Sequence, residues 1–255
     1  MKGAAHAFSV AQAEQERGIR HLRRFVLFRL VPKLATMFAR LSRTNAIMLP
    51  IPAPVDSLSC RRLNSPAEGT NLKSVVIASL NAKLQPIHRG ELEDAFDDLM
   101  QRKGFGMRVV GGGTLQEESG EIAHCDIEIE VDELNDENVQ LVVRALESML
   151  APKGSRLHIP AQDRVLDFGR HEGLALYISG TDLPSEVYAN SDINFVFQEC
   201  DRLLEGVAFV NSHWEGASET ALYMYGKDFE TMRKMIEPLL NTYPLCQKCR
   251  VEQIA

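Results

Sequence analysis

A strand followed by a helix decides the fold, and both lie in residues 122–150, IAHCDIEIEVDELNDENVQLVVRALESML. Apolar residues alternate with acidic ones through Ile127, Ile129 and Val131, which is the two-residue period of a strand with one buried face. From residue 136 onward the apolar residues recur every three or four positions, which is the period of an amphipathic helix. Asp136 is expected to cap this helix at its start.

The neighbouring sequence completes a unit of six elements. Four further segments have strand or helix patterns: residues 74–80, 89–103, 107–115 and 156–159. Gly104 is expected to end the first helix, and Pro152 with Gly154 the second. The predicted order is therefore β-α-β-β-α-β over residues 73–160.

The same order recurs in residues 173–255. Its expected strands are residues 174–179, 207–214, 220–225 and 248–254, and its expected helices are residues 192–204 and 229–241. Corresponding segments are about 92 to 100 residues apart, which indicates duplication of one structural unit. We predict an α+β fold of two tandem units with antiparallel sheets, joined by a connector at residues 161–172.

A sheet in this order has both helices on one face, so its other face needs cover. The second unit is the simplest supplier, and the two sheets are expected to pack face to face or to pair their edges. In element order, residues 73–255 resemble the ferredoxin-like superfamily, whose tandem and dimeric forms include ligand-sensing regulatory modules, small dimeric α+β barrel enzymes and bacterial immunity proteins. The resemblance implies a fold, not an activity, because this fold hosts many unrelated functions.

The head of the chain differs in composition from the rest. Residues 1–72 hold 11 basic and 4 acidic residues, with apolar residues at near-helical spacing between positions 19 and 41. This pattern predicts a basic amphipathic helix, followed by a proline-rich linker from about residue 49. Three interpretations stay open: an organelle transit peptide, a helix on an anionic membrane surface, or a disordered or non-native stretch upstream of a true start at Met48.

The charge and the cysteines of the rest of the chain indicate which partners and which cellular compartment to expect. Residues 73–255 hold 17 basic and 31 acidic residues, a net −14, which repels nucleic acid and favours encounter with a basic protein. No apolar run has the length of about 20 residues that a membrane-spanning helix needs. Five cysteines without framework spacing are expected to be thiols in a reducing compartment. We therefore expect a cytoplasmic protein, or one of an organelle matrix if the head is a transit peptide.

Gly111, Gly112 and Gly113 are the first candidate binding residues. Successive glycines let backbone N–H groups converge on an anion. A phosphate loop, however, joins a strand to a helix and brings a lysine, whereas these glycines lead into another strand. We interpret them first as a β-bulge or a point of close packing, and second as a contact surface.

Two aromatic groups are further candidates. His213, Trp214 and Glu215 end a strand and could form a pocket, a partner contact or an acid-base set, although alternation puts Trp214 on the face opposite the other two. Tyr223 and Tyr225 share a strand face, and Tyr177 is expected to neighbour them. Such a patch could bind a base or a sugar, but packing within a sheet is the favoured interpretation.

The remaining signals indicate no catalytic, metal or cofactor site. Cys246 and Cys249 have the spacing of half a zinc site, and no second pair follows. Asp126, Glu128 and Glu130 lie on the outward side of a strand, and we interpret them as solvated or as steering a basic partner.

These observations favour a non-enzymatic binding module of the immunity or regulatory type, which contacts a basic protein partner through its acidic body. Two alternatives stay open. One is a small-molecule-sensing pair with its ligand at the junction of the repeats. The other is a cofactor-free enzyme of the α+β barrel type that uses His213, Glu215 or a tyrosine for proton transfer.

Overall fold

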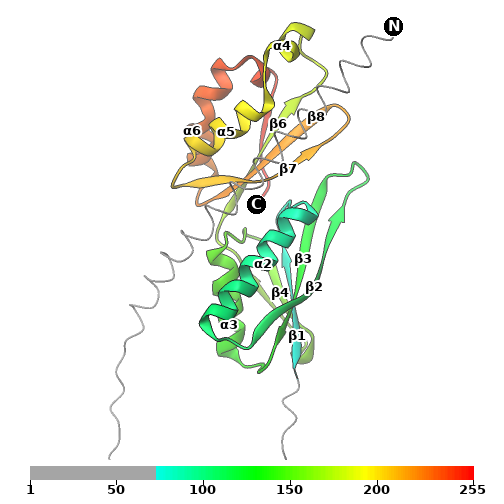
Figure 1. Ribbon diagram of the computed structural model, residues 1–255, viewed down its shortest axis with the longest axis vertical. Helices are drawn as coiled ribbons and strands as arrows, with labels where there is room; N and C mark the ends of the chain where they lie inside the picture. The colour runs from blue at the N-terminus through cyan, green and yellow to red at the C-terminus, as the bar shows by residue number, and fades with distance from the viewer. Residues whose placement is uncertain (1–72) are drawn as a thin grey trace, which may run out of the picture.

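The fold was obtained as a computed structural model, and it describes residues 73–255. The interpretations of the basic head concern residues 1–72 and lie outside the described part of the chain. Two separate antiparallel sheets, each with helices on one face, make up residues 73–255 (Figure 1). The predicted fold class of two tandem ferredoxin-like units is confirmed.

The first sheet has five strands in the order β2-β3-β1-β4-β5. The strands are β1 (Ser74–Leu80), β2 (Met107–Gln116), β3 (Ile122–Val131), β4 (Ser155–Ile159) and β5 (Arg164–Phe168). Helices α2 (Pro86–Lys103) and α3 (Asp136–Ser148) pack on one face, where alternate residues of β1 and β3 are buried in a common core with Phe96 and Leu146.

The helix ends follow local sequence. Asn135, one residue before the predicted cap Asp136, accepts a hydrogen bond from the Asn138 backbone N–H at 2.8 Å and caps α3. Helix α2 begins at Pro86, whose missing N–H costs nothing in the first turn. It ends at Gly104, which has the left-handed φ of 70° that glycine adopts most easily.

The second sheet has four strands in the order β7-β8-β6-β9, the same relative order as β2-β3-β1-β4. The strands are β6 (Glu172–Ser179), β7 (Ala208–Glu215), β8 (Glu219–Gly226) and β9 (Arg250–Gln253), and the helices are α4 (Ser185–Asn190), α5 (Ile193–Leu203) and α6 (Phe229–Thr242). The main helices α5 and α6 pack on one face, and Asp192 and Asp228 cap their starts.

The stretch expected only to connect the units also contributes structure. A short 3₁₀ turn at Pro160–Gln162 leads into β5, which pairs along β4 from Ser155 opposite Phe168 to Ile159 opposite Arg164. The first sheet thus gains a fifth strand that we did not predict. The residue limits of the two units remain a prediction.

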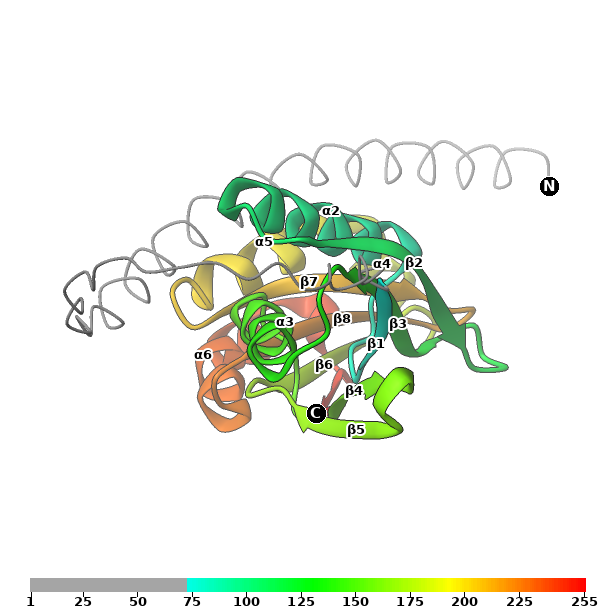
Figure 2. The ribbon, with the colours of Figure 1, turned by 90° about the horizontal axis from the view of Figure 1, so that it is seen from below.

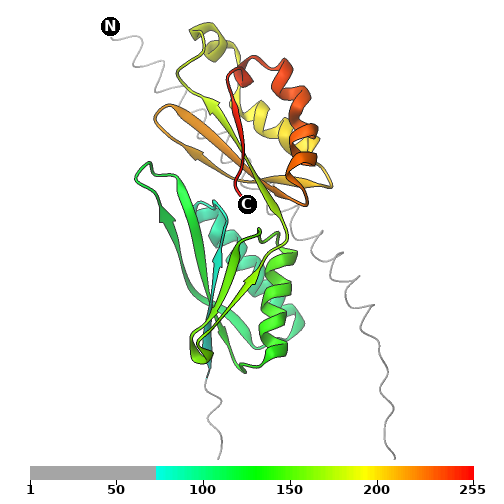
Figure 3. The same cartoon turned by 180° about the vertical axis from the view of Figure 1, so that it is seen from behind.

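The two sheets do not pack face to face. The free side of the second sheet, away from α5 and α6, rests on the end of the first unit, so β7 and β8 run behind that unit in the view from below (Figure 2). Five residues of the second sheet join the core of the first unit: Ala175, Tyr177, Ala221, Tyr223 and Tyr225. From behind, the first unit lies below with its strands toward the viewer (Figure 3). The contact is therefore asymmetric: one sheet face is buried and the other is not.

One glycine holds the link between the units in place. Gly169 has a φ of +97°, and a Cβ there would overlap the backbone carbonyl of Pro152. Gly169→Ala should lower the free energy of unfolding by about 2–4 kcal/mol, because left-handed strain and steric overlap add. Urea denaturation measures the effect. The matched control is Gly206→Ala, with a φ of +85° and nothing within 4 Å of the added Cβ, which should cost only about 1 kcal/mol. Equal losses for the two variants would contradict the overlap.

Candidate functional site

Glu121 forms a polar cluster at the junction of the two units. Its Oε1 accepts hydrogen bonds from the hydroxyls of Tyr177 at 2.7 Å and Tyr223 at 2.8 Å. The same oxygen forms an ion pair of 2.8 Å with Lys83 Nζ. Sequence reasoning missed Glu121 and Lys83, because both lie in turns that approach the tyrosines only after the units pack.

The three candidate tyrosines do share one face. Tyr223 and Tyr225 lie on β8 and Tyr177 on β6, all on the side that packs against the first unit, and all are buried. The Tyr225 hydroxyl accepts the Lys83 backbone N–H at 2.7 Å. Burial, reinforced by the Glu121 carboxylate, raises the pKa of Tyr177 and Tyr223, so both phenols stay protonated at neutral pH. They serve as hydrogen-bond donors within a packed interface.

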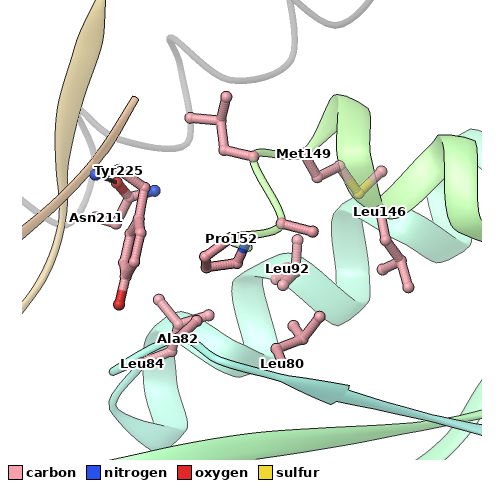
Figure 4. Close-up of a pocket in the computed structure, with 11 residues that line it drawn as sticks. Leu80, Ala82, Leu84, Leu92, Leu146, Met149, Pro152, Asn211 and Tyr225 are labelled. Atoms are coloured by element: carbon pink, nitrogen blue, oxygen red, sulfur yellow. Dashed lines mark hydrogen bonds between the residues drawn. The ribbon is translucent and has the colours of Figure 1, made fainter. Parts of the chain in front are cut away.

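A small cavity lies beside this cluster (Figure 4). It is lined mainly by apolar side chains of the first unit, with Asn211 and Tyr225 of the second at one end. Its volume is about 20 Å³, which is room for about one water molecule, whereas ligand pockets measure roughly 300–1,000 Å³. This cavity is therefore too small to hold an organic ligand.

The structure separates the three candidate residues at the end of β7, which are His213, Trp214 and Glu215. His213 lies at the junction, where its ring is 5.7 Å from that of His88, and Trp214 packs on the core of the first unit. Ser212, next to them, is buried, with its Oγ 3.0 Å from His88 Nδ1. Glu215 is exposed at the end of β7. The structure thus brings His213 and Trp214 to the interface and leaves Glu215 outside it.

The glycines lie at an irregularity of β2. The pairing with β3 shifts register between Val109 and Gly111, which marks a bulge. A Cβ on Gly112 would overlap the Arg89–Glu93 ion pair of α2, so this glycine lets the pair lie against the strand. Burial raises the pKa of Glu93 despite the adjacent arginine. Gly111 and Gly113 belong to the opposite side of the sheet.

The thiols are shielded. Burial raises the pKa of Cys125, Cys200 and Cys246 to about 12, so they are neutral near pH 7 and weak as nucleophiles. Cys249, the other half of the spaced pair, is partly buried. Within residues 73–255 no group of three or more potential ligands could hold a metal ion, and no helix is long and apolar enough to cross a membrane.

The side of the first sheet away from α2 and α3, called here the free face, is not covered by any part of residues 73–255. Its ten central residues are Val75, Ile77 and Ser79 of β1, Asp126, Glu128 and Glu130 of β3, Arg156 and His158 of β4, and Val165 and Asp167 of β5. Val75 is 39% exposed and Val165 is 53% exposed. Val75 thus lies in water on β1, between the acidic β3 and the basic β4, and Val165 lies on the edge strand β5 beyond β4.

Two carboxylates of the free face lack ionic partners within residues 73–255. Hydrogen bonds from Arg108 and Lys73, both at 2.9 Å, lower the pKa of Glu130 to about 2. Asp126, in contrast, has a buried Oδ1 with no hydrogen-bond donor, and Glu128 is exposed without an ion pair. Of the two, the exposed Glu128 is the carboxylate that an incoming cationic group can reach directly. From the sequence these carboxylates were expected to point outward, either solvated or steering a basic partner.

Fold and site together define an α+β protein of two ferredoxin-like units with an exposed sheet face. No protein-family profile and no curated protein matches the chain. Among solved structures it is similar to an unknown protein from Galdieria sulphuraria, with 13% identity, 71% of this chain and 98% of that chain covered, and a TM-score of 0.24. It is also similar to a mutant chlorite dismutase from Candidatus Nitrospira defluvii, with 8% identity, 74% of this chain and 94% of that chain covered, and a TM-score of 0.24. An anthrone oxidase-like protein is 10% identical, with 71% of this chain and 90% of that chain covered and a TM-score of 0.21. TM-scores this low carry no argument for fold or function.

The junction cluster gives a pH-dependent prediction. Burial would raise the pKa of Glu121, but the hydrogen bonds from Lys83, Tyr177 and Tyr223 outweigh it, and the pKa is lowered. At pH values above about 4.3, the pKa of a glutamate in the unfolded chain, the ionised Glu121 contributes its full stabilisation. This contribution is lost as the pH falls through the lower pKa that Glu121 has in the folded chain. Glu121→Gln should reduce the free energy of unfolding by about 2 kcal/mol at pH 7.

Urea denaturation at neutral and acidic pH checks this, with the difference from wild type narrowing below about pH 4. The control is Asp98→Asn, which breaks the exposed 2.7 Å ion pair with Arg102 and should cost about 0.5 kcal/mol or less. A deficit for Glu121→Gln that is the same at both pH values would rule out the charge of Glu121 as its cause.

Proposed function

We propose that the chain is a non-enzymatic protein-binding module, of the immunity or regulatory type, whose binding surface is the free face of the first sheet. The supporting observation is the exposure of two valines on a charged sheet face, Val75 on the central strand β1 and Val165 on the edge strand β5. Exposed apolar side chains ringed by polar ones are typical of protein contact surfaces. The equivalent face of the second sheet is buried against the first unit, so only one such surface is open within residues 73–255.

The chemistry of the partner follows from charge. Asp126 and Glu128 offer carboxylate oxygens without ionic partners, and the net −14 of residues 73–255 attracts a cationic protein from a distance. The best partner therefore places Arg or Lys against β3 and an apolar residue against β1. A small surface of this kind favours recognition that is fast and reversible.

The two alternative functions have less support. A ligand at the junction needs a pocket much larger than the cavity of about 20 Å³ beside Tyr225. A proton-transfer enzyme needs groups that titrate near neutral pH and face a substrate, whereas Tyr177 and Tyr223 are buried with raised pKa values. Apart from the exposed Glu215, the residues that both alternatives would use lie at the contact between the two units.

Charge reversal on the free face tests the proposal. Glu128→Lys should weaken capture of the partner from a lysate of the source organism by roughly tenfold or more, because it places a like charge against a cationic surface. The matched control is Asp94→Lys, the same charge change at an exposed position of α2, which leaves the overall charge of the two variants equal. Quantitative mass spectrometry of cross-linked complexes is the readout. Equal recovery of every partner by both variants would refute the free face as the binding surface.

A further inference from the structure

Two rows of residues run across the free face at right angles to the strands. Backbone pairing sets Glu128 of β3, Ile77 of β1 and His158 of β4 at one level. It sets Asp126, Ser79 and Arg156 at the next level along the same strands. Each row thus has an acid on one side of β1 and a nitrogen donor on the other, and β1 is the middle strand of the sheet.

The charges of each row match those of the same row in a second copy of the chain, if that copy is suitably turned. If a second copy is turned by 180° about an axis along β1, its β4 lies opposite β3 of the first copy. Asp126 then faces Arg156, and Glu128 faces His158, and each contact occurs twice by symmetry. Ile77 meets its own equivalent at the axis. The other in-plane axis, at right angles to the strands, would instead set the acidic β3 against itself, which like charges oppose.

The outer strands fit the same arrangement. In the row of Ile77, the next residues outward are Gly111 of β2 and Val165 of β5. In the row of Ser79, they are Gly113 and Asp167. The rotation sets β2 of one copy over β5 of the other, so glycines without side chains lie opposite the bulkier valine and aspartate. This pairing of small with large residues is what close packing of two sheets requires.

We infer that the free face also pairs with a second copy of this chain, related by a two-fold axis along β1. The rows make this contact locally complementary, although residues 73–255 of each copy carry a net −14. The inference rests on the proposed function, because it uses the same surface. Arg156 is available for it, since its side chain is 63% exposed and its pair with Asp167 is long, at 3.4 Å.

The size of the free face indicates which class of interface the dimer belongs to. Five strands spaced about 4.8 Å apart, each about five residues long, present about 400 Å² in projection. Two copies then bury about 1,000 Å² in total, at the low end of specific interfaces. An interface of this size is typical of weak, reversible association.

A charge exchange between two variants of the full chain tests this symmetry. Asp126→Arg gives a chain with basic groups at both positions of the row, and Arg156→Asp gives one with acidic groups at both. Each variant alone should self-associate at least roughly tenfold more weakly than wild type, because like charges meet twice in its homodimer. An equimolar mixture should dimerise again, because both contacts then join opposite charges.

Sedimentation equilibrium over a concentration series measures the mass against the 28.5 kDa of one chain. Recovery in the mixture also shows that both variants fold. A wild type that stays monomeric throughout, variants that dimerise as wild type does, or a mixture that stays monomeric would each overturn the dimer. The proposed function fails by a separate result, namely unchanged partner capture by Glu128→Lys, so the two failures can be told apart.

Discussion

The open face of each sheet is the constraint on which the structure depends. A sheet with both helices on one side must either bury its other side or present it to water, and the two outcomes need different side chains. In the second unit the free positions of β6 and β8 include Ala175, Tyr177, Ala221 and Tyr223, which are buried against the first unit. In the first unit, β3 supplies Asp126 and Glu128 at its free positions. The difference in packing between the two units therefore follows from the side chains at alternate positions of a few strands.

The contact that buries the free side of the second sheet against the first unit is partly polar. A tyrosine buries a large ring but brings a hydroxyl that needs a partner, and Tyr177 and Tyr223 find the same Glu121 oxygen. Lys83 neutralises the charge that this carboxylate carries into the interface. Because hydrogen bonds are directional, the set favours one placement of the units over sliding along the face, much as a buried polar pair can fix the register of packed helices.

Local patterns predicted much of this fold. The alternation of Ile127, Ile129 and Val131 gave the buried side of β3 correctly, and the repeated element order gave the two sheets. Strand β5 was missed because residues 164–168 are short and mixed, and become a strand only by pairing with the edge of β4. The shared face of the tyrosines was visible from their spacing. Their partner Glu121 was not, because it is 56 residues from Tyr177 and 102 from Tyr223 in the chain.

The core and the free face are set by the same backbone pairing. The register of β1 with β3 and β4 that buries Ile127 and Leu157 also sets Glu128 and His158 level on either side of Ile77. A slip of one residue in either pairing would turn the buried side chains outward, at a large cost in apolar burial. The acid and base rows therefore need no stabilisation of their own. The hydrophobic core holds them in line, and a partner meets a charge pattern that is already rigid.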